Sequence, residues 1–161
     1  MDITTAIIGL AMLSLFVIPA IILSAKNKKR NNALLIGLKK FAAERNCELS
    51  AHDVQPLFAI GIATSGDQAF FIRRQDETDE LIRSSHQMAM TKACDLQVEK
   101  RAVKLLKSDE TVIDKIEICF YSNNKEERNV RWTLYDSAIS PQTDNEFILG
   151  EKWVSIIRKA I

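Results

Sequence analysis

The chain has 161 residues and almost equal numbers of basic and acidic side chains, for a formal net charge of +1. This length allows one domain and a short additional element. The charge is uneven, because residues 26–40 contain six basic side chains and no acidic one, whereas residues 41–161 contain 16 basic and 20 acidic side chains. A mildly acidic domain is poorly suited to sequence-independent phosphate binding, so we expect no nucleic-acid partner.

Residues 1–25 are expected to form a transmembrane anchor. The stretch from Ile3 to Ala25 contains no charged side chain, and a helix of this length crosses a hydrocarbon core. We therefore expect residues 3–25 to contact membrane lipid. A cleaved signal peptide is disfavoured, because the N-terminus carries Asp2 and no base.

The basic cluster after this stretch indicates an orientation. Basic residues near a membrane helix remain cytoplasmic, so we expect a single-pass inner-membrane protein with its N-terminus outside and its C-terminal domain in the cytoplasm. The candidate residues for membrane topology and for possible contact with anionic lipid are Lys26, Lys28, Lys29, Arg30, Lys39 and Lys40. The alternative for these residues is a topology signal followed by a core-packing helix.

A basic collar and an amphipathic helix are expected at residues 26–47. Apolar side chains recur there at helical spacing, at Leu34, Leu35, Leu38, Phe41 and Ala42.

From Leu57 onward the apolar period changes to two, which indicates strands. Leu149 and Trp153 belong to an apolar stripe of a final helix, where tryptophan is usually a core residue, as we also expect for Trp132. The expected strands are Phe58–Thr64, Ala69–Arg74, Glu80–Ser85, Ala93–Lys100, Ile113–Tyr121 and Val130–Tyr135, and the helix is Glu146–Ala160.

This order of elements resembles the pleckstrin-homology-like (PH-like) superfold, and the chain is similar to uncharacterised bacterial membrane-anchored proteins with such a domain. The resemblance implies an α+β fold over residues 48–161, in which a bent antiparallel sheet of about six or seven strands is closed by the C-terminal helix. Eukaryotic members often bind phosphoinositides through bases flanking the first hairpin turn. Here the turn at residues 64–67 has no base, so that role does not carry over.

No catalytic residue, cofactor site or metal site is expected. The three cysteines, Cys47, Cys94 and Cys119, are widely spaced, which favours buried structural thiols over disulfides or zinc ligands. His52 and His86 stand in no ligand motif. A cluster of acids could attract a divalent cation but lacks the glycine and distal glutamate of a calcium loop; it comprises Asp76, Glu77, Asp79 and Glu80.

Two functions remain open. The first is a non-catalytic interaction domain that binds a protein partner through a sheet edge or through the groove beside the last helix. The alternative is a small-molecule sensor or enzyme with a site in the cup of the sheet, around His52, His86 or Arg73.

Overall fold

The computed structural model describes residues 24–25, 27–75, 80–105, 108–123, 129–139 and 145–161. A helix at residues 24–25 and 27–43, called the N-terminal helix below, precedes seven strands. Its length follows from the helical apolar spacing that the sequence shows over this region. The later elements are β1 (Leu49–Val54), β2 (Phe58–Ala63), β3 (Gln68–Arg74), β4 (Leu81–Gln87), the 3-10 turn η1 (Met88–Met90), β5 (Thr91–Leu105), β6 (Ser108–Ser122), β7 (Val130–Asp136) and α2 (Glu146–Arg158).

The strands form two antiparallel sheets rather than one. The first has the order β1-β2-β3-β4 and the second the order β5-β6-β7, so the α+β class stands but the prediction of one bent sheet closed by a helix is wrong. The reason lies at η1, where the chain leaves β4 and enters β5. β4 pairs with β3 and β5 pairs with β6, so the ladder is interrupted at this point, and neither sheet closes within the described residues.

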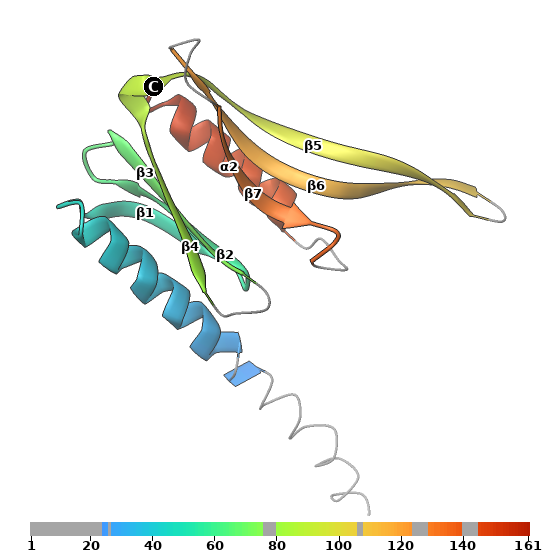
Figure 1. The fold of residues 1–161 in the computed structure, drawn as a ribbon, viewed down its shortest axis with the longest axis horizontal. Coiled ribbons are helices and arrows are strands. Elements are labelled where there is room, and N and C mark those ends of the chain that lie inside the picture. The colour runs from blue at the N-terminus through green and yellow to red at the C-terminus, as the bar shows by residue number, and fades with distance from the viewer. Residues whose placement is uncertain (1–23, 26, 76–79, 106–107, 124–128, 140–144) are drawn as a thin grey trace, which may run out of the picture.

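The N-terminal helix covers one face of the first sheet (Figure 1). Leu34, Leu38 and Phe41 are buried against this face, together with Phe70 of β3, whose ring meets that of Phe41 edge to face. The opposite face of the sheet, carrying Phe58 and neighbouring side chains, packs toward the second sheet. Both faces are therefore covered, which explains why every residue of β2 is buried.

The described helices contradict the membrane location that the sequence predicted. Among the described residues, no helix is long and apolar enough to cross a membrane. The N-terminal helix instead has one face on the sheet and exposes its bases, among them Lys28 and Lys39. The predicted anchor at residues 1–25 lies, except for residues 24 and 25, outside the described residues. The description of the chain as a single-pass inner-membrane protein is contradicted and is not retained.

The space between the two sheets is filled by aromatic side chains. Phe71 of β3 stacks on Trp132 of β7 with ring centroids 5.3 Å apart, and Phe120 of β6 meets the same indole edge to face at 4.6 Å. α2 packs against the three strands of the second sheet and contributes Leu149 and Trp153 to the same core. The prediction that both tryptophans are core residues is confirmed.

The hairpin of β5 and β6 extends beyond the rest of the second sheet (Figure 1). The pairing of β6 with β7 ends at Lys115 and Asp136. β5 and β6 continue as a two-stranded ribbon up to the pair Leu105 and Ser108. Each of these strands is consequently longer than its apolar alternation predicted.

Gly150 allows α2 to approach β5 closely. A Cβ atom at this position would lie 2.6 Å from Leu96 Cδ1 and 3.1 Å from Leu134 Cδ1. We expect Gly150→Ala to lower the free energy of unfolding by about 1 kcal/mol, because overpacking outweighs the better helix propensity of alanine. Urea denaturation would measure this change. Ser155→Ala, at an exposed position of the same helix, is the matched control, and equal gains in stability for both variants would contradict the prediction.

Candidate functional site

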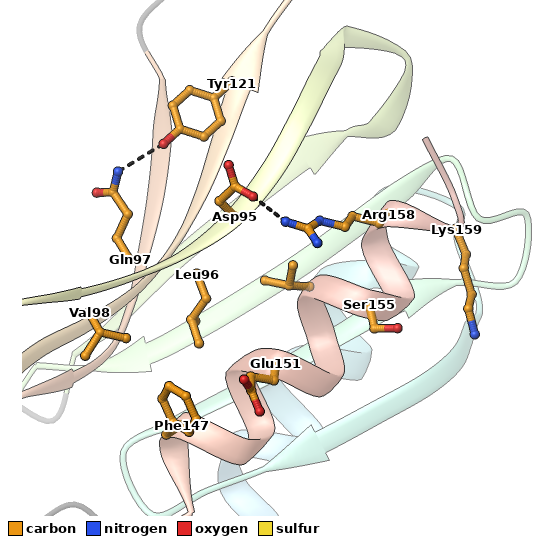
Figure 2. A pocket seen from close by; sticks show the side chains of 11 residues that line it. Asp95, Leu96, Gln97, Val98, Tyr121, Phe147, Glu151, Ser155, Arg158 and Lys159 are labelled. Atoms are coloured by element: carbon orange, nitrogen blue, oxygen red, sulfur yellow. Dashed lines mark hydrogen bonds and ion pairs between the residues drawn. The ribbon is translucent and has the colours of Figure 1, made fainter.

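A groove of about 840 Å³ lies between the outer edge of β5 and α2 (Figure 2). One wall comes from the second sheet and the other from the helix. The lining residues are Asp95, Leu96, Gln97, Val98, Tyr121, Phe147, Glu151, Val154, Ser155, Arg158 and Lys159. The groove has the dimensions of a site for a peptide or a small molecule.

The β5 wall presents backbone groups that β6 does not use. β5 is an edge strand of its sheet, and the carbonyl oxygen of Cys94 accepts a hydrogen bond from Arg158 Nε at 2.8 Å. This carbonyl therefore points away from β6. In an antiparallel pair the inward and outward residues alternate, and the register is regular from Ala93 to Glu99. The N–H and C=O groups of Leu96 and Val98 must consequently point outward as well.

The helical wall is formed by side chains spaced along one face of α2. Phe147, Glu151, Ser155 and Arg158 follow one another at intervals of three or four residues, which places them in a row along the helix. Phe147 is 40% exposed although it is a large apolar side chain. The helical wall thus offers an apolar end, an acidic middle and a basic end.

Three polar contacts hold α2 against β1 and β5. Asp53 of β1 accepts hydrogen bonds from Lys152 Nζ at 2.6 Å and from the Trp153 indole N–H at 2.8 Å. Within the groove, the Arg158 guanidinium forms an ion pair with Asp95 of β5. These contacts tie the helix to both sheets and fix the width of the groove.

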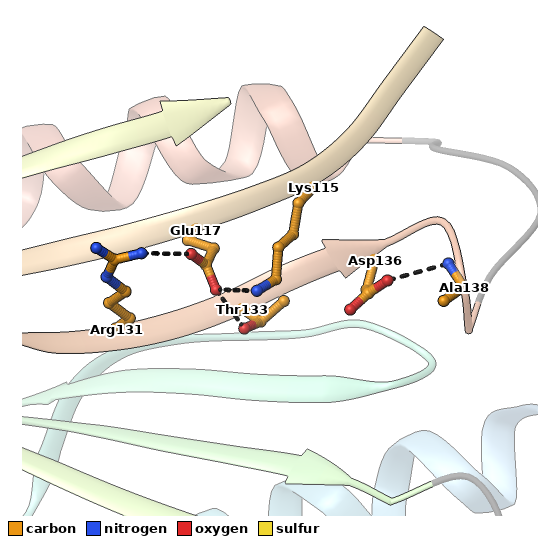
Figure 3. A network of polar contacts seen from close by, with 6 residues as sticks. All are labelled: Lys115, Glu117, Arg131, Thr133, Asp136 and Ala138. Atoms are coloured by element: carbon orange, nitrogen blue, oxygen red, sulfur yellow. Dashed lines mark hydrogen bonds and ion pairs between the residues drawn. The ribbon is translucent and has the colours of Figure 1, made fainter. Parts of the chain in front are cut away.

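A polar network occupies the face of the second sheet opposite the core (Figure 3). The Glu117 carboxylate accepts hydrogen bonds from Lys115 at 2.9 Å and from Thr133 at 2.8 Å, and Arg131 lies 3.6 Å away. Burial raises the pKa of Glu117, but the hydrogen bonds from Lys115 and Thr133 and the nearby positive charges outweigh it, and the net pKa is lowered. This network stabilises the charged form of the Glu117 carboxylate, and we interpret it as a contribution to the stability of the fold.

The cysteines are placed as structural thiols. Cys94 and Cys119 are buried, as predicted, whereas Cys47 is only partly buried. Burial raises the pKa of Cys94 to about 12, against the opposing charge of Arg158, and burial also raises the pKa of Cys119. Because the thiolate is the reactive form, neither buried thiol is prepared for nucleophilic chemistry.

The residues considered for a site in the cup of the sheet do not converge. His52 is exposed on β1, and His86 lies on β4 with Nε2 2.7 Å from Thr91 Oγ1. β1 and β4 are opposite edges of the first sheet, while Arg73 lies on β3. Aromatic rings fill the space between the sheets. The described residues do not bring these three side chains into one polar pocket.

The remaining sequence candidates that the structure describes do not line the groove. Lys28, Lys29, Arg30, Lys39 and Lys40 are exposed on the N-terminal helix, and Lys26 lies outside the described residues. Of the acidic cluster only Glu80 is described, and it is exposed. In the part of the chain that the structure describes, no three His, Cys, Asp or Glu side chains are grouped to hold a metal ion.

The sequence suggested a groove beside the last helix but did not identify its residues. The recurring positions Phe147, Glu151 and Ser155 form a second stripe on α2, next to the buried one. An apolar residue at the start of such a mixed stripe is the signal that would have identified this wall. Comparison with protein-family models found no matching model, and comparisons with curated proteins and with solved structures found no match.

Proposed function

We propose that this chain is a non-enzymatic interaction domain, and that an extended segment of a protein partner binds in the groove as an additional strand beside β5. The observation that carries the proposal is the open edge of β5 at Leu96 and Val98, facing α2 across the groove. Strand addition is a common mode of peptide recognition, in which backbone hydrogen bonds supply affinity and alternate side chains supply specificity.

The edge offers a short and defined set of hydrogen-bonding groups. Leu96 and Val98 each present one N–H and one C=O, which together can bond to two residues of an incoming strand. Arg158 already occupies the outward carbonyl of Cys94, and a bulge follows between Glu99 and Lys100. The bound segment is therefore confined to the stretch between these two features.

The groove also supplies what a bare sheet edge lacks. An exposed strand edge alone pairs with many chains and is an aggregation hazard. Here α2 forms a wall along one side, so a bound strand must fit its side chains against Phe147, Glu151 and Ser155. This wall makes selective binding possible.

Val98→Pro tests the proposal. A displayed library of random decapeptides would be selected on the wild-type chain, and the affinity of an enriched synthetic peptide would be measured by calorimetry. Proline removes the outward N–H of Val98 without removing a bond to β6, and proline is tolerated at sheet edges. We expect at least about a tenfold loss of affinity, because a bond is lost and the ring obstructs the edge.

Val98→Ala is the matched control, because it shortens the side chain but keeps the N–H. It should lose clearly less affinity than Val98→Pro, because it gives up part of the apolar contact but keeps the backbone hydrogen bond. Amide resonances of Leu96 and Val98 should shift when the peptide binds to the wild-type chain, and thermal unfolding would verify that both variants fold. The proposal fails when no peptide is enriched, or when a folded Val98→Pro variant binds as tightly as the wild type.

A further inference from the structure

The geometry of strand addition determines which side chains of a bound segment would meet α2. This inference rests on the proposed function. Side chains of a strand alternate between the two faces of a sheet, and residues paired across two strands point to the same face. Leu96 points toward α2, since its Cδ1 lies next to Gly150. Partner residues paired with Leu96 and Val98 therefore point toward the helix, and the residue between them points away.

The groove is apolar where a partner residue would pair with Val98. Val98 and Phe147 both line this end of the groove, and Phe147 is 40% exposed. An apolar side chain inserted between them would remove both from water, which is the main source of favourable free energy at a small interface. This end of the groove is suited to a Leu, Ile, Met or Phe of the partner.

The groove is acidic where a partner residue would pair with Leu96. Gly150 approaches Leu96, and the next residue of the helix, Glu151, is exposed and lines the groove at this level. Within the described residues, no ion pair is found for Glu151. The neighbouring charges are already compensated, because Arg158 pairs with Asp95 and Lys152 pairs with Asp53.

Lys159 does not cancel the charge of Glu151. It lies beyond Arg158 at the end of the groove, and its ammonium group points away from β5 in Figure 2. The part of the groove that faces Leu96 and Val98 therefore has one uncompensated negative charge, beside an apolar surface. A basic side chain complements this arrangement, and electrostatic complementarity contributes to specificity more than to affinity.

We infer that the groove selects an extended segment with a large apolar residue followed two residues later by Lys or Arg. The order follows from antiparallel addition to β5, the more stable of the two pairings. In that orientation the segment passes Val98 before it passes Leu96. The apolar side chain packs on Val98 and Phe147, and the basic side chain faces Glu151.

The test is a parallel selection on three proteins. The random decapeptide library would be selected on the wild type, on Glu151→Lys and on Glu48→Lys. Glu48→Lys is the matched control, because Glu48 is exposed but does not line the groove. We expect the apolar–x–basic pattern on the wild type and on the control. On Glu151→Lys the third position should change to Asp or Glu.

Affinities of one enriched peptide give a second readout. Replacing its basic residue with Gln should weaken binding to the wild type about two- to fivefold, the usual range for an exposed ion pair. The same replacement should have no effect on binding to Glu151→Gln. The inference would be overturned if the apolar–x–basic pattern is missing or reversed, or if the third position stays basic on Glu151→Lys. Strand addition would still stand in these cases if Val98→Pro weakens binding as expected. Failure to enrich any peptide would refute both.

Discussion

Replacing Trp132 with alanine should lower the free energy of unfolding by about 3–5 kcal/mol. The indole is 1% exposed and lies between the two sheets, stacked on Phe71 and in edge contact with Phe120. Its N–H donates a hydrogen bond to Ser84 Oγ of β4 at 2.9 Å. The substitution therefore creates a cavity where the sheets meet and leaves the Ser84 hydroxyl without this donor.

Urea denaturation followed by circular dichroism would measure this effect. Trp132→Phe separates the contributions, because it keeps an aromatic ring but removes the indole N–H, and it should cost less than the alanine variant. Ile148→Ala is a control on the surface, since Ile148 is 67% exposed, and should change stability by less than about 0.5 kcal/mol. A loss below about 1 kcal/mol for Trp132→Ala would show that this ring does not join the sheets.

The local pattern of the sequence predicts the central strands well and the edges poorly. The stretch from Phe58 to Ala63 contains no polar side chain, because both faces of β2 are buried. The pattern does not predict β1, because Leu49–Val54 is an edge strand in which half-buried and exposed residues mix and His52 and Asp53 interrupt the apolar positions.

The division into two sheets could not be predicted from local pattern. Strands of either architecture show the same period of two, and only the pairing distinguishes them. β4 and β5 follow one another in the chain, and consecutive strands usually pair, which favoured a single continuous sheet. The 3-10 turn at Met88–Met90 prevents this pairing, and its sequence contains neither Gly nor Pro to signal a break.

The groove illustrates the same limit. Its two walls come from β5 and α2, which are separated by 40 residues of sequence (106–145), and no motif links them. The hydrogen bond from Arg158 to the Cys94 carbonyl shows which backbone groups of β5 point outward. From the sequence alone, Arg158 is only a base that suits a helix C-terminus. Its contact with the Cys94 carbonyl is visible only in the three-dimensional structure.

Glu117→Gln should lower the free energy of unfolding by about 2–3 kcal/mol near neutral pH. The Glu117 side chain is 5% exposed and accepts hydrogen bonds from Lys115 and Thr133, with Arg131 close by. Glutamine keeps the shape but loses the negative charge, so it leaves the Lys115 ammonium, which is 33% exposed, without its counter-charge. Glu48→Gln, at an exposed glutamate just before β1 and away from this network, is the matched control and should have little effect.

The pH dependence separates the charge from the shape of the side chain. The pKa of Glu117 is lowered in the folded chain from its usual value of 4.5, so the charged form stabilises the fold above the unfolded pKa. This contribution is lost as the pH falls through the folded pKa. The pKa of Lys115 is raised from 10.5, chiefly by its hydrogen bond to Glu117, so its contribution is lost as the pH rises through that higher value.

The stability difference between wild type and Glu117→Gln should therefore be largest between these two pKa values and shrink at both more acidic and more basic pH. A difference that does not change between neutral pH and strongly acidic pH would show that packing, and not the carboxylate charge, stabilises this face of the sheet.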